Sequence, residues 1–182
     1  MQEFNWITFL IYPLINLMIF LYFFGLAIGW HMRKNSVIAI DVDTLSNIQP
    51  IIQQCKIYAN NTGKDFFSYF IGHIEEQLPI PKGIVRALEY QSLGYTLCFV
   101  TSRPEEVRLQ TSKFLNSWSL RGELYMYQNL DESFIENSAY IKKQLFDYIA
   151  NNKKLVGMIS LEKGLNGICK QRIKKMPSIG DK

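Results

Sequence analysis

Two short apolar runs, each ending abruptly on polar residues, constrain the fold of this chain more than any other feature. They are residues 37–43 (VIAIDVD) and residues 97–104 (LCFVTSRP). Each has the length and side-chain types of a strand that is buried in a parallel sheet. Ligands of open α/β sheets bind at the carboxyl edge, where such strands end. The two runs therefore predict a site in which an aspartate pair faces a hydroxyl and a guanidinium, a set suited to a metal ion and a phosphate.

The rest of the chain alternates expected strands and helices. Strands are expected at residues 37–40, 95–100, 123–127 and 155–159. Pro81 and Gly94 bound one intervening helix, and Pro104 is expected in the first turn of the next. The apolar helix faces are expected to contain Ile84, Leu88 and Leu93, then Val107, Phe114, Leu115 and Trp118, and finally Ile141, Leu145 and Ile149. Strands separated by helices predict right-handed βαβ units, so the fold class is α/β, a three-layer Rossmann-like parallel sheet.

One segment, residues 46–80, interrupts this alternation directly after the aspartate pair. Its apolar residues include Phe66, Phe67, Tyr69, Phe70 and Ile71. Such a segment can fold as a small helical lid over the strand ends. Helical packing beside the sheet explains the same pattern equally well, so both interpretations stay open.

The N-terminal segment has the composition of a membrane-spanning helix. Residues 4–30 contain no Asp, Glu, Lys, Arg or His, and this length exceeds the roughly 20 apolar residues that a bilayer core requires. Trp6 and Trp30 stand near its ends, where indoles prefer the headgroup region. Arg33 and Lys34 flank only its carboxyl side, which predicts a single-pass membrane protein whose C-terminal domain is cytoplasmic.

A secretory signal peptide is the competing interpretation of this segment. A signal peptide carries a basic n-region, and none of the first five residues is Lys or Arg. Gly25, Leu26 and Ala27 only weakly resemble a cleavage site. The predicted organisation is therefore a membrane anchor with its basic flank at residues 1–35, an α/β domain at 36–170 and a basic tail at 171–182.

Charge and cysteine content fit a cytoplasmic domain. The chain carries 20 basic and 16 acidic residues, a net charge of +4. The three cysteines, Cys55, Cys98 and Cys169, match no metal-binding spacing, and Cys98 is expected in the core. Part of the excess charge lies in a cluster that is either a solvated tail or a contact for anionic lipid or nucleic acid: Lys170, Arg172, Lys174 and Lys175.

The polar motifs resemble a known family in order and in context. Asp41-x-Asp43 follows the first strand, Thr101-Ser102-Arg103-Pro104-Glu105 follows the second, and Lys142-Lys143 opens a later helix. Together they resemble motifs one, two and three of the haloacid dehalogenase superfamily of phosphohydrolases. The resemblance spans about residues 36–165 and is nearest to the branch that contains the 3′-phosphatase domain of polynucleotide kinases.

This resemblance implies a role for each matching residue. Asp41 would attack phosphorus to form an aspartyl phosphate, and Asp43 would act as general acid and base. The transferring phosphate would be bound by Thr101, Ser102, Arg103 and Lys142. A Mg²⁺ ion would be held by Asp41, Asp43 and Glu162. Taken singly, each has a simpler structural explanation, such as a turn cap, a local ion pair or a solvated lysine.

The sequence departs from the family pattern at two places, in motif one and in motif four. Motif one normally continues with glycine, whereas Asp43 runs directly into Thr44 and Leu45. Motif four normally supplies acidic metal ligands after the last strand, whereas this chain has Ser160-Leu161-Glu162, with the acid displaced. Loss of a carboxylate is expected to weaken a Mg²⁺ site.

Three functions from different classes follow from these patterns. The first is a membrane-anchored, Mg²⁺-dependent phosphatase that acts on a phosphorylated small molecule, such as a nucleotide, or on a polynucleotide end. The second is a catalytically degenerate domain of the same fold that serves as an interaction or regulatory module. The third is an anchored protein whose aromatic segment or basic tail contacts a protein partner.

The charge asymmetry around residues 4–30 gives a testable topology. A phosphatase or fluorescent reporter fused after Lys182 is expected to report a cytoplasmic location, because Arg33 and Lys34 favour retention of that flank. The matched control places two lysines on the amino side of the segment and replaces Arg33 and Lys34 with neutral residues. Periplasmic reporter activity of the unaltered chain would contradict the orientation.

Overall fold

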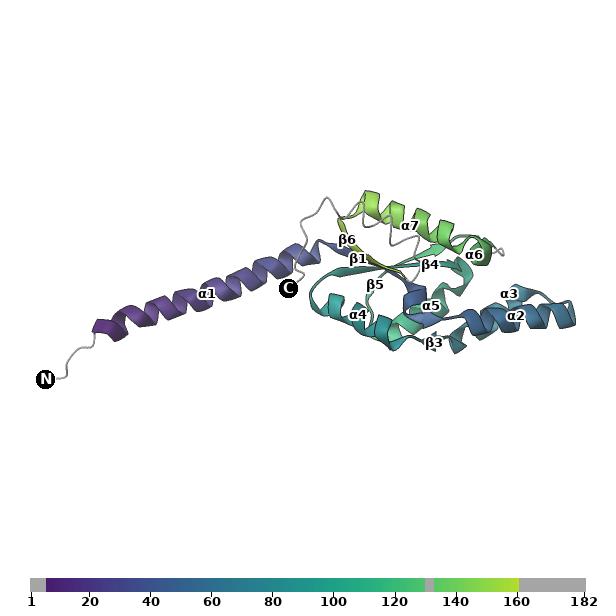
Figure 1. Ribbon diagram of the computed structural model, residues 1–182, viewed down its shortest axis with the longest axis horizontal. Helices are drawn as coiled ribbons and strands as arrows, with labels where there is room; N and C mark the ends of the chain where they lie inside the picture. Colours follow the sequence, from purple (N-terminus) through teal and green to yellow (C-terminus); the bar gives the residue numbers. More distant parts are fainter. Residues whose placement is uncertain (1–5, 130–132, 161–182) are drawn as a thin grey trace.

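The protein is an α/β domain preceded by one long helix. The computed structural model describes residues 6–129 and 133–160 (Figure 1). Four parallel strands form the main sheet in the order β5-β4-β1-β6. They are β1 (Val37–Asp41), β4 (Thr96–Pro104), β5 (Gly122–Tyr127) and β6 (Leu155–Ile159). All four predicted strands and the α/β class are thus confirmed, and the strand order places the topological switch point beside β1.

Helices cover both faces of the sheet. On one face, α4 (Pro81–Ser92) and α5 (Arg108–Ser117) enclose a core with Ile38, Ile40, Leu97 and Phe99. On the other face, α7 (Ser138–Asn152) packs on the intervening strand residues, among them Ala39, Cys98 and Val100. Successive strand residues alternate between the two cores, as the period of a strand requires. Cys98 is fully buried, as predicted.

The helix expected to begin at Pro104 starts later. Strand β4 continues through Pro104, whose φ of −66° and ψ of 154° are extended, and a 3-10 turn, η3 (Glu105–Val107), precedes α5. A residue before proline is biased toward extended backbone, which favours continuing the strand. Trp118, predicted on the packed face, lies just past the end of α5 and is 39% exposed.

Residues 46–80 form a helical pair on a short β stem. Strand β2 (Ser46–Asn47) pairs antiparallel with β3 (Leu78–Pro79). Between them lie α2 (Gln49–Thr62), α3 (Phe66–His73) and the 3-10 turn η2 (Ile74–Glu76). Phe66 and Phe70 are buried in a separate core that also contains Val107 and Met126. The aromatic residues thus build this unit and join it to the sheet, while its action as a lid stays a prediction.

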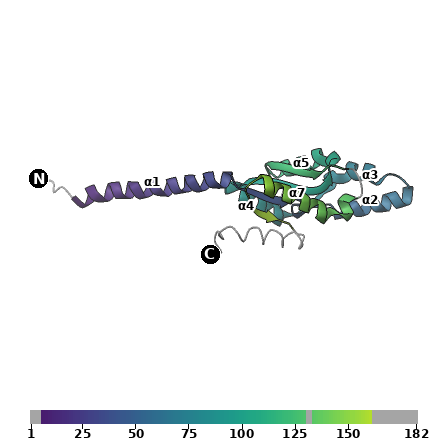
Figure 2. The ribbon, with the colours of Figure 1, turned by 90° about the horizontal axis from the view of Figure 1, so that it is seen from above.

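Helix α1 (Trp6–Lys34) and the helical pair project from opposite ends of the domain (Figures 1 and 2). The part of α1 from Pro13 to Lys34 is long and apolar enough to cross a membrane, with a mean hydropathy of 1.8. Its last turn contacts the amino edge of the sheet, where the Thr96 hydroxyl donates a hydrogen bond to the Lys34 carbonyl at 2.9 Å. The opposite, carboxyl edge of the sheet carries the predicted site residues.

One glycine fixes the distance between α4 and the turn that follows β1. Gly83 lies in the first turn of α4, and a Cβ atom added there would come within 1.9 Å of the Thr44 carbonyl oxygen. Both groups are backbone, so neither can move without shifting a whole element. The absence of a side chain at Gly83 therefore positions the turn that carries Asp43.

We expect Gly83→Ala to lower the free energy of unfolding by about 1–3 kcal/mol, the usual cost of overpacking. The loss should occur although alanine favours helices over glycine. Gly72→Ala in α3 is the matched control, because a Cβ there meets nothing within 4 Å. Urea denaturation of the full chain in detergent micelles measures both, and equal midpoints for the two variants would contradict the close-approach argument.

Candidate phosphate-ester site

The strand register brings the ends of three strands together. Asp41, the last residue of β1, is paired with Val100 of β4, so Thr101 follows one residue beyond it. On the other side Ile40 is paired with Ile159 of β6. Ser160 therefore lies beside Asp41. The predicted meeting of the aspartate pair with the Thr101–Arg103 group at one sheet edge is confirmed.

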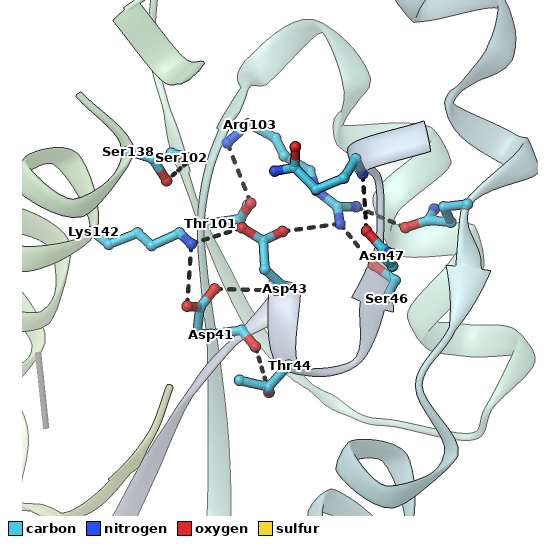
Figure 3. Close-up of polar contacts among 12 residues, drawn as sticks. Asp41, Asp43, Thr44, Ser46, Asn47, Thr101, Ser102, Arg103, Ser138 and Lys142 are labelled. Carbon is cyan, nitrogen blue, oxygen red and sulfur yellow. Dashed lines mark hydrogen bonds and ion pairs between the residues drawn. The ribbon is translucent and has the colours of Figure 1, made fainter. Parts of the chain in front are cut away.

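Asp41 is held by hydrogen bonds to both carboxylate oxygens and is only 1% exposed. Its Oδ1 accepts a hydrogen bond from the Asp43 backbone N–H at 3.0 Å. Its Oδ2 accepts from Lys142 Nζ at 3.1 Å and from Ser160 Oγ at 2.9 Å. Together these three donors fix the rotamer of the carboxylate, and Figure 3 shows the contacts of Asp41 with Lys142 and with the turn that carries Asp43.

Asp43 lies in a 3-10 turn, η1 (Val42–Thr44), rather than in the glycine loop of the family pattern. The Thr44 hydroxyl closes this turn by donating to the Asp41 carbonyl at 2.7 Å. No residue of this described turn has a positive φ, so the missing glycine is not needed. Asp43 is the accessible acid of the pair, with 31% of its side chain exposed.

Lys142 projects from α7 and bridges the two acids. Its Nζ lies 3.1 Å from Asp41 Oδ2 and 2.6 Å from Asp43 Oδ2, and its side chain is 2% exposed. The apolar face of α7, which includes Ile141 and Ile149, holds the helix against the sheet. The sequence correctly places Lys142 at the site, although it is separated from the acids by about a hundred residues.

Arg103 connects the site to the stem of the helical pair. Its guanidinium is fully buried; Nη1 donates to Gln77 Oε1 at 2.8 Å, and Nη2 donates to Ser46 Oγ at 2.7 Å and to Asp43 Oδ1 at 3.3 Å. Among the described atoms, Arg103 Nε has no hydrogen-bond partner. These partners are protein groups, so the predicted binding of a phosphate by Arg103 stays a prediction.

The two hydroxyls beside Arg103 are also buried. Thr101 Oγ1 accepts a hydrogen bond from the Arg103 backbone N–H at 3.2 Å. Ser102 Oγ lies 2.9 Å from Ser138 Oγ at the start of α7. Both hydroxyls belong to the same sheet edge as the acids, and their predicted contact with a phosphate is untested.

Burial and charge shift the pKa values of the two acids in opposite directions. Burial, together with the charge of Asp43, raises the pKa of Asp41 to about 6 against the opposing effect of Lys142. Burial alone would raise the pKa of Asp43 as well, but the charges of Lys142 and Arg103 hold it below its ordinary value. Without a ligand, Asp41 is therefore the acid that takes up a proton first as the pH falls.

The described donors at this edge of the sheet do not meet the coordination requirements of Mg²⁺. Mg²⁺ prefers octahedral oxygen coordination and gives up its water reluctantly. Among the residues that the structure describes, no group of three or more His, Cys, Asp or Glu side chains could hold a metal ion. Lys142 already bridges the two carboxylates, and Glu162 lies outside the described residues. This donor set does not fit Mg²⁺, so no step below is routed through a metal and the ion stays a prediction from sequence.

Three polar residues of the site were not predicted from sequence: Ser46, Gln77 and Ser160. Ser160 had a usable signal, because it directly follows the fourth predicted strand and therefore has to end at the same edge as Asp41. Ser46 and Gln77 contact Arg103 only because β2 and β3 pair, and a two-residue strand leaves no sequence pattern.

Comparisons with known proteins find a similar fold among solved structures and no match to a family model or a curated protein. Among solved structures, a chain of a Pnkp1/Rnl/Hen1 complex aligns with a TM-score of 0.52 and 17% sequence identity, covering 76% of this chain. This chain spans only 43% of that neighbour. At this identity the likeness shows a shared fold alone.

The bridge made by Lys142 gives a stability prediction. Lys142→Met leaves the buried Asp41 carboxylate without a neutralising cation, while Asp43 keeps Arg103, and an unpaired buried charge typically costs about 3–5 kcal/mol. We expect a loss of this size in urea denaturation, and little change for the exposed neighbour Lys143→Met. In an Asp41→Asn background the loss should shrink, because the two sites are coupled. Equal unfolding midpoints for the Lys142 and Lys143 variants would exclude a neutralising role for Lys142.

Proposed function

We propose that this chain is a haloacid-dehalogenase-like hydrolase of phosphate monoesters. The observation that supports the proposal is the convergence of Asp41, Asp43, Thr101 and Lys142 on one sheet edge, with both acids within hydrogen-bonding distance of Lys142. Four residues that match three motifs of the family in sequence order also meet in space. A chance Asp-x-Asp turn would not bring the other two motifs with it.

Each residue has a chemical task that fits its position. Asp41 Oδ1 or Oδ2 attacks phosphorus, forming an acyl phosphate and breaking the bond to the ester oxygen. Asp43, the more exposed acid, protonates the departing oxygen and later removes a proton from the water that hydrolyses the intermediate. Lys142 neutralises charge that develops on the phosphoryl oxygens. The donors on Asp41 hold its carboxylate in place for the attack.

The substrate class that we propose is a nucleotide or a polynucleotide end. The neighbouring structure supports this choice only indirectly, because its title names Pnkp1 in a complex and the likeness extends to the fold alone. We also propose that α1 anchors the enzyme in a bilayer with the domain in the cytoplasm, which rests on the length and composition of Pro13–Lys34 and on the basic flank.

A second candidate function is a catalytically degenerate domain that serves as an interaction or regulatory module for a protein partner. Two observations favour it. Ser160 stands beside Asp41 where the family has an acid. The pKa of Asp41 is raised and that of Asp43 is lowered, whereas a nucleophile is most useful ionised and a general acid protonated. Hydrolysis decides between the two functions.

The test is hydrolysis of p-nitrophenyl phosphate by the full chain in detergent micelles, with and without Mg²⁺. We expect turnover that Asp41→Asn reduces by at least a thousandfold, because the covalent step is lost, and that Glu89→Gln on the exposed side of α4 leaves unchanged. The rate should fall as the pH drops below about 6, since Asp41 then takes up a proton and cannot attack. Equal, negligible rates for all three proteins would favour the degenerate module.

A further inference from the structure

Within residues 6–129 and 133–160, the charges of the site balance without any added ion. Two carboxylates, Asp41 and Asp43, face two cations, Lys142 and Arg103, at distances of 2.6–3.3 Å. Three of these side chains are at most 2% exposed. A buried pair of carboxylates normally requires neutralisation, and here side chains of the protein supply all of it.

The position that should complete a metal site instead carries a hydrogen-bond donor. Ser160 follows β6 at the level of Asp41, and its hydroxyl donates to Asp41 Oδ2 at 2.9 Å. The same oxygen accepts from Lys142. A divalent ion bound to this oxygen would have to displace at least one of these two donors, and Ser160 would offer it a neutral hydroxyl in place of an anionic ligand.

We propose that Lys142 and Ser160 together replace the divalent cation, so that this site holds its two aspartates in a catalytic arrangement without Mg²⁺. The Lys142 ammonium supplies the positive charge between the carboxylates, and the Ser160 hydroxyl fixes Oδ2 of Asp41. The inference deepens the proposed function, because it states how the same site neutralises its charge. Its test measures metal binding and not hydrolysis, so the inference and the proposed function can fail independently.

The experiment uses Mn²⁺ as the probe and the full chain in detergent micelles. Electron paramagnetic resonance measures free Mn²⁺ during a titration, and thermal unfolding in the presence of Mg²⁺ gives a second reading. We expect no saturable Mn²⁺ binding at this site, so the unaltered chain and Asp41→Asn should give the same titration curve. Ser160→Asp should bind Mn²⁺ about tenfold more tightly or better, since it restores an anionic ligand beside Asp41. Ser160→Ala is the matched control and should gain nothing.

Two results would overturn the inference. One is stoichiometric Mn²⁺ binding by the unaltered chain that is lost in Asp41→Asn, which would show that the existing residues hold a metal. The other is a folded Ser160→Asp protein, judged by circular dichroism, that binds no more Mn²⁺ than Ser160→Ala. If Ser160→Asp does not fold, the titration of the unaltered chain against Asp41→Asn still decides. Absence of hydrolysis together with absence of metal binding would refute the proposed function alone.

Discussion

The ion pairs of Lys142 with Asp41 and Asp43 are the interaction on which the rest of the site depends. Two carboxylates two residues apart repel each other, and burial increases the cost of keeping them charged. Lys142 offsets this cost from α7, and α7 can supply it only because its apolar face packs on β1 and β4. The core on that face of the sheet thus keeps the Lys142 ammonium beside both carboxylates. A shift of α7 would separate the ammonium from both acids.

Arg103 extends this dependence to the helical pair. Its guanidinium contacts Asp43 on one side and Ser46 and Gln77 of the β stem on the other. The stem and the accessible acid therefore share one buried cation. Movement of residues 46–80 relative to the sheet would change the partners of Arg103 and, through them, the charge balance at Asp43. The position of residues 46–80 and the charge environment of Asp43 are therefore coupled through Arg103.

The parts of the fold that depend on long apolar runs could be predicted from sequence. Residues 37–40 and 155–159 read as strands because burial on both faces demands continuous apolar residues. The arrival of Asp41 and Thr101 at one edge of the sheet was predictable because parallel strands end together. The position of Lys142 was predictable only from the resemblance to the family motifs. The start of α5 was not predictable, because β4 stays extended through Pro104 and a 3-10 turn precedes the helix. Ser160 could be placed at this edge because it follows the fourth predicted strand, but its hydrogen bond to Asp41 depends on the register of β6, which no local pattern specifies.

The position of α1 relative to the site follows from the direction of β1. Helix α1 joins the amino end of this five-residue strand, and Asp41 is the last residue at its carboxyl end. The hydrogen bond from Thr96 to Lys34, at the end of α1, therefore lies at the amino edge of the sheet, and Trp30 lies close to Gly94 there. Groups that would bind a phosphate ester lie at the other edge. A membrane surface at the end of α1 and a substrate at Asp41 would thus occupy opposite edges of the sheet, and neither would obstruct the other.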